Sequence, residues 1–296
     1  MIALVTGSEG FLGRHFVKHL RQSGYIVMPV DVRHTTRPVD ARDFFRADTG
    51  QWDLVVHCAA VVNGREVIEN SPMDQVIDFE LDAALFRWLS QADVAKTVYF
   101  SSSAAYPVAL QDGTHPHFLS ETEIDLAMPQ LPDALYGWTK LTGEFLAQHA
   151  RAAGHDVLVV RPFSGYGEDQ ADCYPFPAIM RRAFNREDPF VIWGSADQVR
   201  DFIHVDDIVG AVMAFVEAGI QGPINIGTGF PTSMRELALT ATMQLDYVPK
   251  FEPLTDKPAG VMYRVAQTVA MLDHYTPKIS IEEGVARALA KLATEA

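Results

Sequence analysis

Tyr136 and Lys140 stand at positions i and i+4, so on a helix their side chains leave the same face, one turn apart. A free phenol titrates near pH ~10 and is a poor base at neutral pH. A lysine ammonium held beside a phenol favours the phenolate, which makes the tyrosine a usable proton acceptor. This spacing is common on ordinary helix faces, so the pair indicates catalysis only together with features elsewhere in the chain.

Three serines could supply a hydroxyl to the same chemistry. Ser101, Ser102 and Ser103 directly follow a short apolar stretch, 98–100, that we predict to be a strand. In a parallel sheet the ligand crevice lies outside the carboxyl ends of the strands. We therefore expect the serine run to lie at the edge of such a crevice.

The N-terminal residues have the pattern of a dinucleotide-binding unit. An apolar run at 2–6 is followed by Thr-Gly-x-x-Gly-x-x-Gly at 6–13 and by helical apolar periodicity up to Gly24. A second apolar run, 25–30, comes next. The order of strand, glycine turn, helix and strand is the context in which a glycine triplet predicts dinucleotide binding.

Each glycine of the triplet has its own expected role. Gly7 allows the tight turn, Gly10 lets a pyrophosphate approach the backbone, and Gly13 lets helix and strand pack closely. The pyrophosphate would lie at the helix N-terminus, where free N–H groups favour an anion. Asp31 ends the second strand, where a carboxylate binds the adenosine ribose and repels a 2′-phosphate, which favours NAD over NADP. Arg33 follows closely and could weaken that preference.

Further strands and helices are predicted downstream. We expect strands at 44–47, 54–57, 98–100 and 156–160, and helices at 74–92 and from the catalytic pair to Gly154. Asp48 ends the first of these strands and either reaches the adenine or is a solvated loop acid. Cys58, Ala59 and Ala60 follow the strand at 54–57, and small residues there would let a cofactor lie across the backbone.

These elements predict an α/β fold, a Rossmann-type doubly wound parallel sheet with a smaller C-terminal substrate-binding lobe. We place the Rossmann domain at 1–162, with 204–228 returning to it, and the lobe at 163–203 and 229–296. Residues 107–133 hold many prolines, acids and turn formers and are expected to form an irregular excursion.

The composition argues against several classes of protein. The 296 residues are 48% hydrophobic and 21% charged, the balance of a soluble globular protein. The net charge of −14 argues against nucleic acid or an anionic membrane surface as a partner, so an anionic substrate would need local arginines. Two cysteines exclude a disulfide framework and show no metal-ligand spacing, so we expect no metal site. Because we find no signal peptide and no run long enough to cross a bilayer, we expect a cytoplasmic protein.

Taken in order, the motifs resemble those of the extended short-chain dehydrogenase/reductase family, in its NAD-dependent nucleotide-sugar epimerase and dehydratase branch. The likeness covers nearly the whole chain. It is carried by the glycine motif at 6–13, His57-Cys58-Ala59-Ala60, the serine run, Tyr136 with Lys140, Arg161-Pro162, 200–207 and 225–229. Residues 102–107 and 193–195 are most similar to the GDP-fucose synthase and GDP-mannose epimerase group.

The resemblance implies roles for individual residues. Tyr136 and Lys140 match the catalytic pair, and the catalytic serine matches Ser102 when counted from Tyr106 and Ser103 when counted from the strand; we prefer Ser102. The matching cofactor-binding positions are Gly7, Gly10, Phe11, Leu12, Gly13, Asp31, Asp48, Ala59, Tyr136 and Lys140. The matching substrate-binding positions are Ser103, Ser164, Arg200 and Arg264, with both arginines at the nucleotide diphosphate. NAD, a nucleotide-diphosphate sugar and a homodimer are further implied.

Three departures from the family pattern bear on the activity. Dehydratases of this branch carry an Asp-Glu pair beside the catalytic hydroxyl, whereas 101–105 contains no acid. GDP-fucose synthase has a cysteine where this chain has Ala104, and its partner histidine falls near Tyr174. The usual Asn-x-Tyr-Gly-Pro is replaced at 164–168 by Ser-Gly-Tyr-Gly-Glu, which puts the substrate contacts there in doubt.

The resemblance and its departures predict an NAD-dependent nucleotide-sugar 4-epimerase that works through a transient 4-keto sugar. Tyr136 would take the proton of the 4-hydroxyl while NAD accepts hydride from C4, and Ser102 would hydrogen-bond that oxygen. A 4-ketoreductase would use the same residues for a single hydride transfer and would exchange its cofactor at every turnover. Asp31 disfavours this alternative, because enzymes that carry out a net reduction more often use NADP. A non-catalytic NAD-sensing protein is a third alternative, which the intact serine, tyrosine and lysine set makes the weakest.

Overall fold

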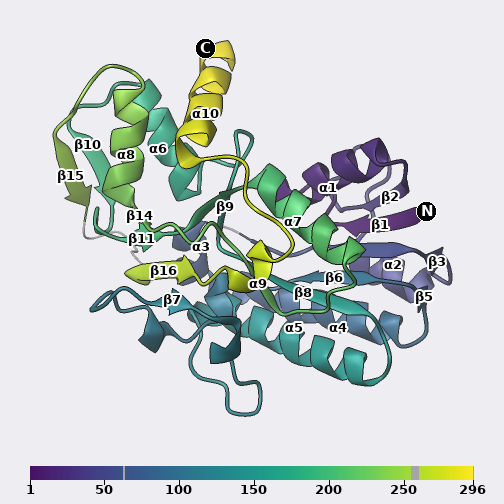
Figure 1. Cartoon of the computed structure of the whole chain (residues 1–296). Coiled ribbons are helices and arrows are strands. Elements are labelled where there is room, and N and C mark those ends of the chain that lie inside the picture. The colour runs from purple at the N-terminus through teal and green to yellow at the C-terminus, as the bar shows by residue number, and fades with distance from the viewer. Residues whose placement is uncertain (63, 255–259, 296) are drawn as a thin grey trace.

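A parallel sheet forms the centre of the larger domain (Figure 1). The computed structural model describes residues 1–62, 64–254 and 260–295. Within them the six strands of this sheet run in the order β13 (Ile224–Ile226), β8 (Val157–Pro162), β6 (Thr97–Phe100), β4 (Leu54–His57), β1 (Ile2–Thr6) and β2 (Ile26–Val30). The chain leaves β1 for the edge strand β2 and then crosses back to β4, so the switch point lies between β1 and β4. Ligands bind at such a point, outside the carboxyl ends of the strands.

The strand residues alternate between two hydrophobic cores, one on each face of the sheet. Ala3 and Val5 of β1 belong to one core and Leu4 to the other, as the two-residue period of a strand requires. The helices that cover the two faces are α1 (Phe11–Gln22) and α7 (Val205–Glu217) on the first, and α2 (Ala41–Ala47), α4 (Val76–Leu89) and α5 (Ala134–Ala152) on the second. Figure 1 shows α1 and α7 above the sheet and α4 and α5 below it. The predicted doubly wound α/β fold is confirmed.

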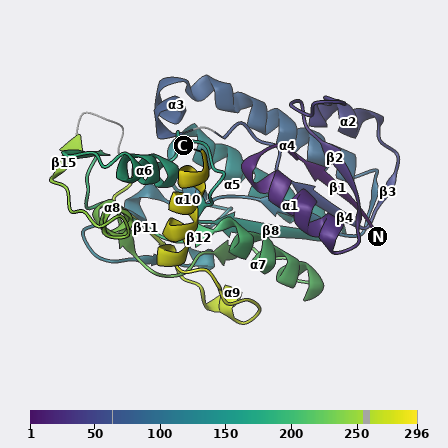
Figure 2. The same cartoon turned by 90° about the horizontal axis from the view of Figure 1, so that it is seen from above.

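A smaller lobe packs beside the carboxyl ends of the sheet (Figures 1 and 2). Its strands are β9 (Ser164–Tyr166) with β12 (Phe202–His204), β10 (Phe190–Trp193) with β15 (Phe251–Leu254), and the mixed sheet β14 (Thr232–Ser233), β11 (Val199–Arg200), β16 (Tyr263–Ala266) and β7 (Phe118–Leu119). Its helices are α6 (Pro175–Phe184), α8 (Met234–Met243) and α10 (Ile281–Glu295). Phe176, Phe190, Leu237 and Val285 are buried in its own core, so the lobe is a separate packing unit.

Short elements connect the larger ones. They are β3 (Gln51–Trp52), which pairs with β5 (Asp93–Val94), the helices α3 (Arg65–Asn70) and α9 (Val269–Leu272), and the 3₁₀ turns η1 (Pro72–Gln75), η2 (Ser103–Ala105), η3 (Val108–Leu110) and η4 (Glu121–Glu123). No helix in the described ranges has the length and apolar character needed to cross a bilayer.

The predicted strand at 44–47 is wrong, because these residues belong to helix α2. Asp40 caps α2 by accepting a hydrogen bond from the backbone N of Arg42 (2.8 Å). Ala41 and Phe45, one helical turn apart, are the buried residues of this helix. Two adjacent phenylalanines favour a strand by local propensity, but a helix of this register places Phe45 in the core of the sheet.

Two segments contribute to a part of the fold other than the one that we predicted for them. The excursion at 107–133 supplies β7, which pairs with β16 and so adds an edge strand to the lobe. In the segment at 229–296, expected in the lobe, Met271 lies instead in a core of the main sheet. Tyr275 donates a hydrogen bond to Asp207 of α7 (2.8 Å), which ties this part of the chain to the larger domain.

Candidate active site

The first glycine turn packs so tightly that it excludes side chains. Gly7 has φ +65°, and a Cβ there would lie 2.6 Å from the backbone N of Ala59. A Cβ at Gly13 would lie 2.0 Å from the carbonyl O of Gly7, so no other residue would let α1 approach β1 this closely. Gly10 is the N-cap of α1, without a side-chain cap. The first backbone N–H groups of α1 are thus left for an anion, and the cradle fits a dinucleotide pyrophosphate.

Phe11 and Leu12 continue this cradle into the first turn of α1. Leu12 packs against the core beneath the helix. The Phe11 ring lies edge-on to His15, with 5.7 Å between centroids, and close to Gly167, where a Cβ would be 3.2 Å from the ring. Phe11 therefore sits where the larger domain meets the segment after β9.

Asp31 lies beside this cradle. The carboxylate is 6% exposed and accepts hydrogen bonds from the backbone N of Glu9 (3.0 Å) and of Arg33 (2.7 Å). Asp31 thereby orders the turn on which an adenosine ribose would lie. The Arg33 guanidinium extends back over this turn, 3.6 Å from the place of a Cβ at Gly10. Because acid and arginine are both in reach, the preference for NAD over NADP stays a prediction.

Asp48 is the C-cap residue of α2, and its carboxylate forms hydrogen bonds within the turn that follows the helix. Its carboxylate accepts hydrogen bonds from Trp52 Nε1 (2.9 Å) and from the backbone N of Gly50 (3.3 Å). The expected contact of Asp48 with adenine stays a prediction.

Tyr136 and Lys140 share one face of α5, as their spacing predicts. Lys140 is buried, and its Nζ lies 5.7 Å from the ring centroids of both Tyr136 and Tyr99. Burial acts to lower the pKa of Lys140, but the charges of Tyr136, Asp82 and Asp78 outweigh it and raise the pKa above its usual range. The ammonium therefore remains charged beside the phenol at neutral pH.

Gly137 lets helix α5 approach the turn η2. A Cβ at Gly137 would lie 2.4 Å from the carbonyl O of Ala104, so only glycine allows this contact. Asp133, just before α5, donates its backbone N to the same carbonyl (2.9 Å). The start of α5, with Tyr136, is thereby fixed beside the serine run.

The three serines lie in different environments. Ser101 donates a hydrogen bond to the buried Glu144 (2.5 Å) and belongs to the interior. Ser102 caps η2, with its Oγ accepting from the backbone N of Ala104 (3.1 Å), and is only partly buried. Ser103 is buried within the turn. The choice of Ser102 as the catalytic hydroxyl and of Ser103 as a substrate contact stays a prediction.

An arginine cluster lies where the lobe meets α5. Arg200 and Arg264 are register neighbours on the parallel strands β11 and β16. Arg264 donates hydrogen bonds from Nε to Gln111 (2.5 Å) and from Nη2 to Asp133 (2.8 Å). Arg65, from α3, donates to the other oxygen of Asp133 (2.7 Å). Two guanidinium groups therefore bind one carboxylate, and Arg200 lies beside one of them on the neighbouring strand.

The electrostatics of this cluster favour an anionic ligand. Desolvation, with repulsion from Arg264 and Arg65, lowers the pKa of Arg200 to about 9. Burial would raise the pKa of Asp133, but Arg264 and Arg65 outweigh it and hold that pKa below its usual range. A diphosphate would relieve the repulsion between the guanidinium groups, and its oxygens suit their forked donors.

Ser164 lies next to the arginine cluster in the fold. Its backbone N donates to the carbonyl of Asp201 (2.9 Å), in the parallel pair of β9 with β12. The carboxylate of Asp201 accepts hydrogen bonds from Thr228 and Gly229 and from the backbone N of Ala266. Ser164 is thus held near Arg200, and its contact with a substrate stays a prediction.

The model of the NAD dependent epimerase/dehydratase family matches residues 3–227, which is most of the chain. The protein belongs to this family. The glycine cradle, the tyrosine–lysine pair and the arginine cluster are the candidate site of this family enzyme, and a nicotinamide cofactor and a nucleotide sugar are the ligands to consider.

Several family members resemble this chain along most of its length. A Methanocaldococcus jannaschii protein provisionally named as a UDP-glucose 4-epimerase is 27% identical over 305 residues, covering 96% of each chain. The Escherichia coli GDP-L-fucose synthase is 26% identical over 308 residues, covering 95% of this chain and 93% of its own. Among solved structures, the UDP-glucuronic acid 4-epimerase of Bacillus cereus, in complex with UDP-glucuronic acid and NAD, has a TM-score of 0.83 at 22% identity, covering 100% of both chains. At that identity the structure supports the fold alone.

Four residues at the family site escape the sequence analysis. Asp78 and Asp82 of α4 contribute negative charge at Lys140, and their i, i+4 spacing on a largely apolar helix is the signal that could have found them. Arg65 and Asp133 meet across the fold, and no local pattern marks them.

Tyr174 lies near Tyr136, from the side of the lobe. Its hydroxyl donates to the carbonyl of Val62 (3.1 Å). Burial raises the pKa of Tyr174, and the charge of Tyr136 raises it further. A protonated phenol therefore occupies the region where the resemblance to GDP-fucose synthase places a histidine.

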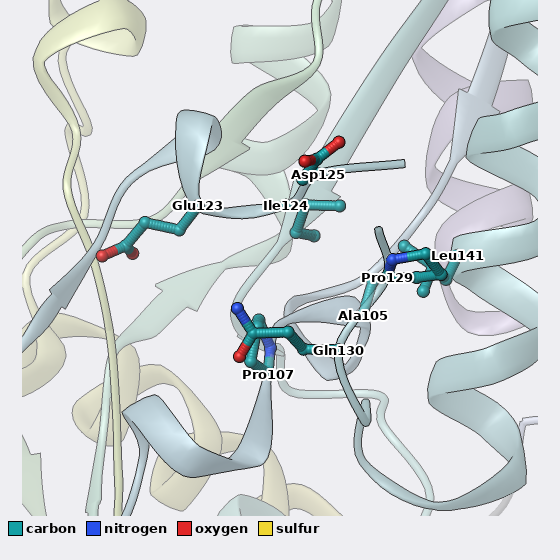
Figure 3. A pocket seen from close by; sticks show the side chains of 8 residues that line it. All are labelled: Ala105, Pro107, Glu123, Ile124, Asp125, Pro129, Gln130 and Leu141. Atoms are coloured by element: carbon teal, nitrogen blue, oxygen red, sulfur yellow. The ribbon is translucent and has the colours of Figure 1, made fainter. Parts of the chain in front are cut away.

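A small pocket under the excursion is no candidate for the substrate site (Figure 3). It lies between Ala105, Ile124, Pro129 and Leu141, and its volume is about 10 Å³. A cavity of this size holds one water molecule at most. The candidate site therefore remains the region that carries the glycine cradle, the tyrosine–lysine pair and the arginine cluster.

Proposed function

We propose that the protein is an NAD-dependent 4-epimerase of a nucleotide-diphosphate sugar. The observation that carries the proposal is the position of Tyr136. Its helix begins at Asp133, which binds Arg264 of the arginine cluster, and its neighbour Lys140 is a buried cation. A sugar whose diphosphate lies on the arginines would extend toward the phenol.

Each residue has a role in this reaction. Tyr136 takes the proton of the sugar 4-hydroxyl and later returns it, and Lys140 stabilises the phenolate form by its charge. Ser102 hydrogen-bonds the 4-oxygen. The glycine cradle would hold NAD, which would supply the hydride acceptor for C4 of the sugar. Arg200 and Arg264 hold the diphosphate while the 4-keto sugar rotates in the site and presents its other face.

Three features favour an epimerase over other family activities. The residues beside the serine run, 101–105, contain no acid that could assist a dehydration. Ala104 offers a methyl group where proton exchange at C3 or C5 would need a thiol. Asp31 adds support because a carboxylate against the adenosine ribose suits NAD, the form that a closed hydride cycle uses.

A nucleotide-sugar 4-ketoreductase is the second candidate, and Arg33 favours it. Its guanidinium reaches the glycine turn at Gly10, where it could pair with a 2′-phosphate. A dTDP-4-dehydro-6-deoxy-D-allose reductase of Streptomyces is 29% identical over 265 residues, covering 79% of this chain. The same serine, tyrosine and lysine would then act once per cofactor.

Incubation with a panel of nucleotide sugars tests the proposal. The purified protein is supplied with UDP-, GDP- and dTDP-hexoses, with and without added NAD, and the products are separated by chromatography and identified by mass spectrometry and NMR. We expect one substrate to equilibrate with its 4-epimer without a reductant. Tyr136→Phe serves as the control and should form no epimer. Absence of any epimer across the panel, with reduction of a 4-keto sugar by NADH or NADPH, would favour the ketoreductase.

A further inference from the structure

Two adjacent acids after strand β9 bind partners in different parts of the fold. Glu168 binds the lobe: its Oε2 lies 3.3 Å from Nε2 of His204, and its carbonyl O accepts a hydrogen bond from Nζ of Lys291 in α10 (3.1 Å). Asp169 binds helix α1 of the larger domain instead. Residues 167–169 therefore connect the lobe to the helix of the glycine cradle, and we call them the clasp.

Asp169 contacts α1 through two side chains. Arg14 donates from Nε to the carboxylate (2.6 Å) and from Nη2 to the carbonyl O of Asp169 (2.5 Å). His15 Nε2 lies 3.1 Å from both carboxylate oxygens. Burial would raise the pKa of Asp169, but the hydrogen bonds from His15 and Arg14 outweigh it and hold that pKa well below its usual range. The carboxylate is therefore charged at neutral pH, and its several donors distinguish it from an isolated surface ion pair.

Gly167 brings the clasp against the first residue of α1. A Cβ at Gly167 would lie 2.8 Å from Val205 Cγ1 and 3.2 Å from the Phe11 ring, so a larger residue would push the clasp away from the helix. The Phe11 ring in turn packs on both partners of Asp169: its centroid lies 5.7 Å from that of His15 and 5.5 Å from the guanidinium carbon of Arg14. The clasp thus lies along the first turn of α1.

The first turn of α1 is the part of the glycine cradle that would bind a pyrophosphate, because its backbone N–H groups are free. These donors bind an anion well only when the turn is already ordered. A preorganised site binds its ligand more tightly, and differences in affinity between variants of one site appear mostly in the dissociation rate. A contact that fixes the first turn from outside should therefore slow the release of a dinucleotide.

We propose that Asp169 is a positioning residue for the cofactor: through Arg14 and His15 it fixes the first turn of α1 and so retains a dinucleotide in the glycine cradle. This inference rests on the proposed binding of NAD. Retention suits an enzyme that returns the hydride to the sugar in every cycle and has no need to exchange its cofactor. Glu168, which ties the clasp to the lobe, stands where the family pattern has proline, so this connection is not implied by the resemblance.

The rate of dinucleotide release tests this role without any sugar. Protein loaded with NADH is mixed with excess NAD in a stopped-flow instrument, and the loss of the fluorescence of bound NADH is followed. We expect release about tenfold faster in Asp169→Asn than in the wild type, as for the loss of charge-assisted hydrogen bonds in a partly exposed pair. The matched control is Asp172→Asn, which removes an exposed acid three residues later that pairs with Arg181 of α6 (2.7 Å), and it should release NADH at the wild-type rate. A wild-type rate in Asp169→Asn, or an equal acceleration in Asp172→Asn, overturns the proposal.

A variant on the helix side tests the contact from its other end. Arg14→Gln should also release NADH faster than the wild type. Because Arg14 and Asp169 contribute to one interaction, the double variant Asp169→Asn/Arg14→Gln should release NADH no faster than Asp169→Asn alone. A general loss of folding would make the two effects add, and additive effects contradict a clasp.

Epimer formation without added NAD separates this inference from the proposed function. Wild-type enzyme that is diluted and assayed without NAD should stay active through the NAD that it retains, whereas Asp169→Asn should lose activity and regain it when NAD is added. If no sugar is epimerised but the release rates follow the expected order, the proposed function fails while the role of Asp169 stands. If epimer forms and Asp169→Asn releases NADH at the wild-type rate, the proposed function stands and the role of Asp169 fails.

Discussion

Arg264 of the lobe donates a hydrogen bond to Asp133 (2.8 Å), and Tyr136 lies one helical turn after Asp133. The same carboxylate binds Arg65 of the larger domain (2.7 Å). A diphosphate bound to the arginines would therefore contact Arg264, which also binds Asp133 at the start of α5. We infer that substrate binding and the placement of Tyr136 are coupled through this one carboxylate.

Arg200 should contribute to affinity for the nucleotide rather than to folding. Its guanidinium is desolvated and repelled by two other arginines. Arg200→Gln therefore removes a charge that is unfavourable in the ligand-free protein. Charge-assisted hydrogen bonds contribute about 1.5–3 kcal/mol, so the Kd for UDP or GDP should rise roughly tenfold to a hundredfold. Calorimetric titration measures this. Arg181→Gln, which breaks an exposed ion pair with Asp172 on the lobe, is the control. An unchanged Kd in Arg200→Gln would remove Arg200 from the site.

Tyr136→Phe keeps the ring and removes the group that exchanges the proton. General acid–base groups contribute ~10²–10⁴-fold, so kcat should fall by that factor while NAD binding is kept. Lys140→Met should reduce both turnover and NAD affinity, because the ammonium lies beside the phenol and Lys140 also matches a cofactor-binding position of the family. Steady-state kinetics and NAD titration report the two effects. A loss of less than about tenfold in Tyr136→Phe would exclude Tyr136 as the base.

NAD should bind more tightly than NADP, because the Asp31 carboxylate would lie against the 2′-phosphate. Titration of both dinucleotides into cofactor-free protein measures the ratio of the two Kd values. Asp31→Asn should reduce the preference, and Arg33→Gln should leave NAD binding unchanged. Equal affinity, or a preference for NADP, would mean that Arg33 controls the pocket.

Asp78 should make the protein less stable as the pH rises. The pKa of its carboxyl is raised to about 6 in the folded chain, so the proton is bound more tightly folded than unfolded. The contribution of this proton to the free energy of unfolding is fully present below the pKa of an aspartate in the unfolded chain, near ~3.9. It is lost as the pH rises through 6. Asp78→Asn should therefore gain stability relative to the wild type between pH 4 and pH 8, by up to about 3 kcal/mol. Urea unfolding at both pH values measures the change, and a difference that is the same at pH 4 and pH 8 would contradict it.

Much of the fold follows from local patterns in the sequence. The glycine turn, the apolar strands and the acid at the end of β2 lie within one short stretch, so their spacing determines their arrangement. Helix α2 was missed because Phe44 and Phe45 favour a strand locally, whereas packing against the sheet requires Phe45 on a helical face. Long-range packing therefore determined the secondary structure of residues 41–47.

The candidate site likewise has residues that the sequence predicts and residues that only long-range packing brings together. The Tyr136–Lys140 face follows from spacing, and the pairing of Arg200 with Arg264 brings together two arginines that the family resemblance marks separately. Asp133 and Arg65 are far apart in sequence and meet only when the lobe and α3 close on the start of α5. Asp78 and Asp82 are visible as a spacing, but their burial against Lys140 depends on the contact between α4 and α5.

The fate of the hydrogen at C4 tests the epimerase proposal most directly. A nucleotide sugar deuterated at C4 is incubated with the enzyme in ordinary water, and the product is examined by NMR and mass spectrometry. Because an epimerase returns the hydride that it takes, we expect the 4-epimer to keep deuterium at C4 without consumption of added NADH or NADPH. Stoichiometric consumption of NADH or NADPH with a 4-keto sugar, and no epimer in its absence, would contradict the proposal and identify a ketoreductase.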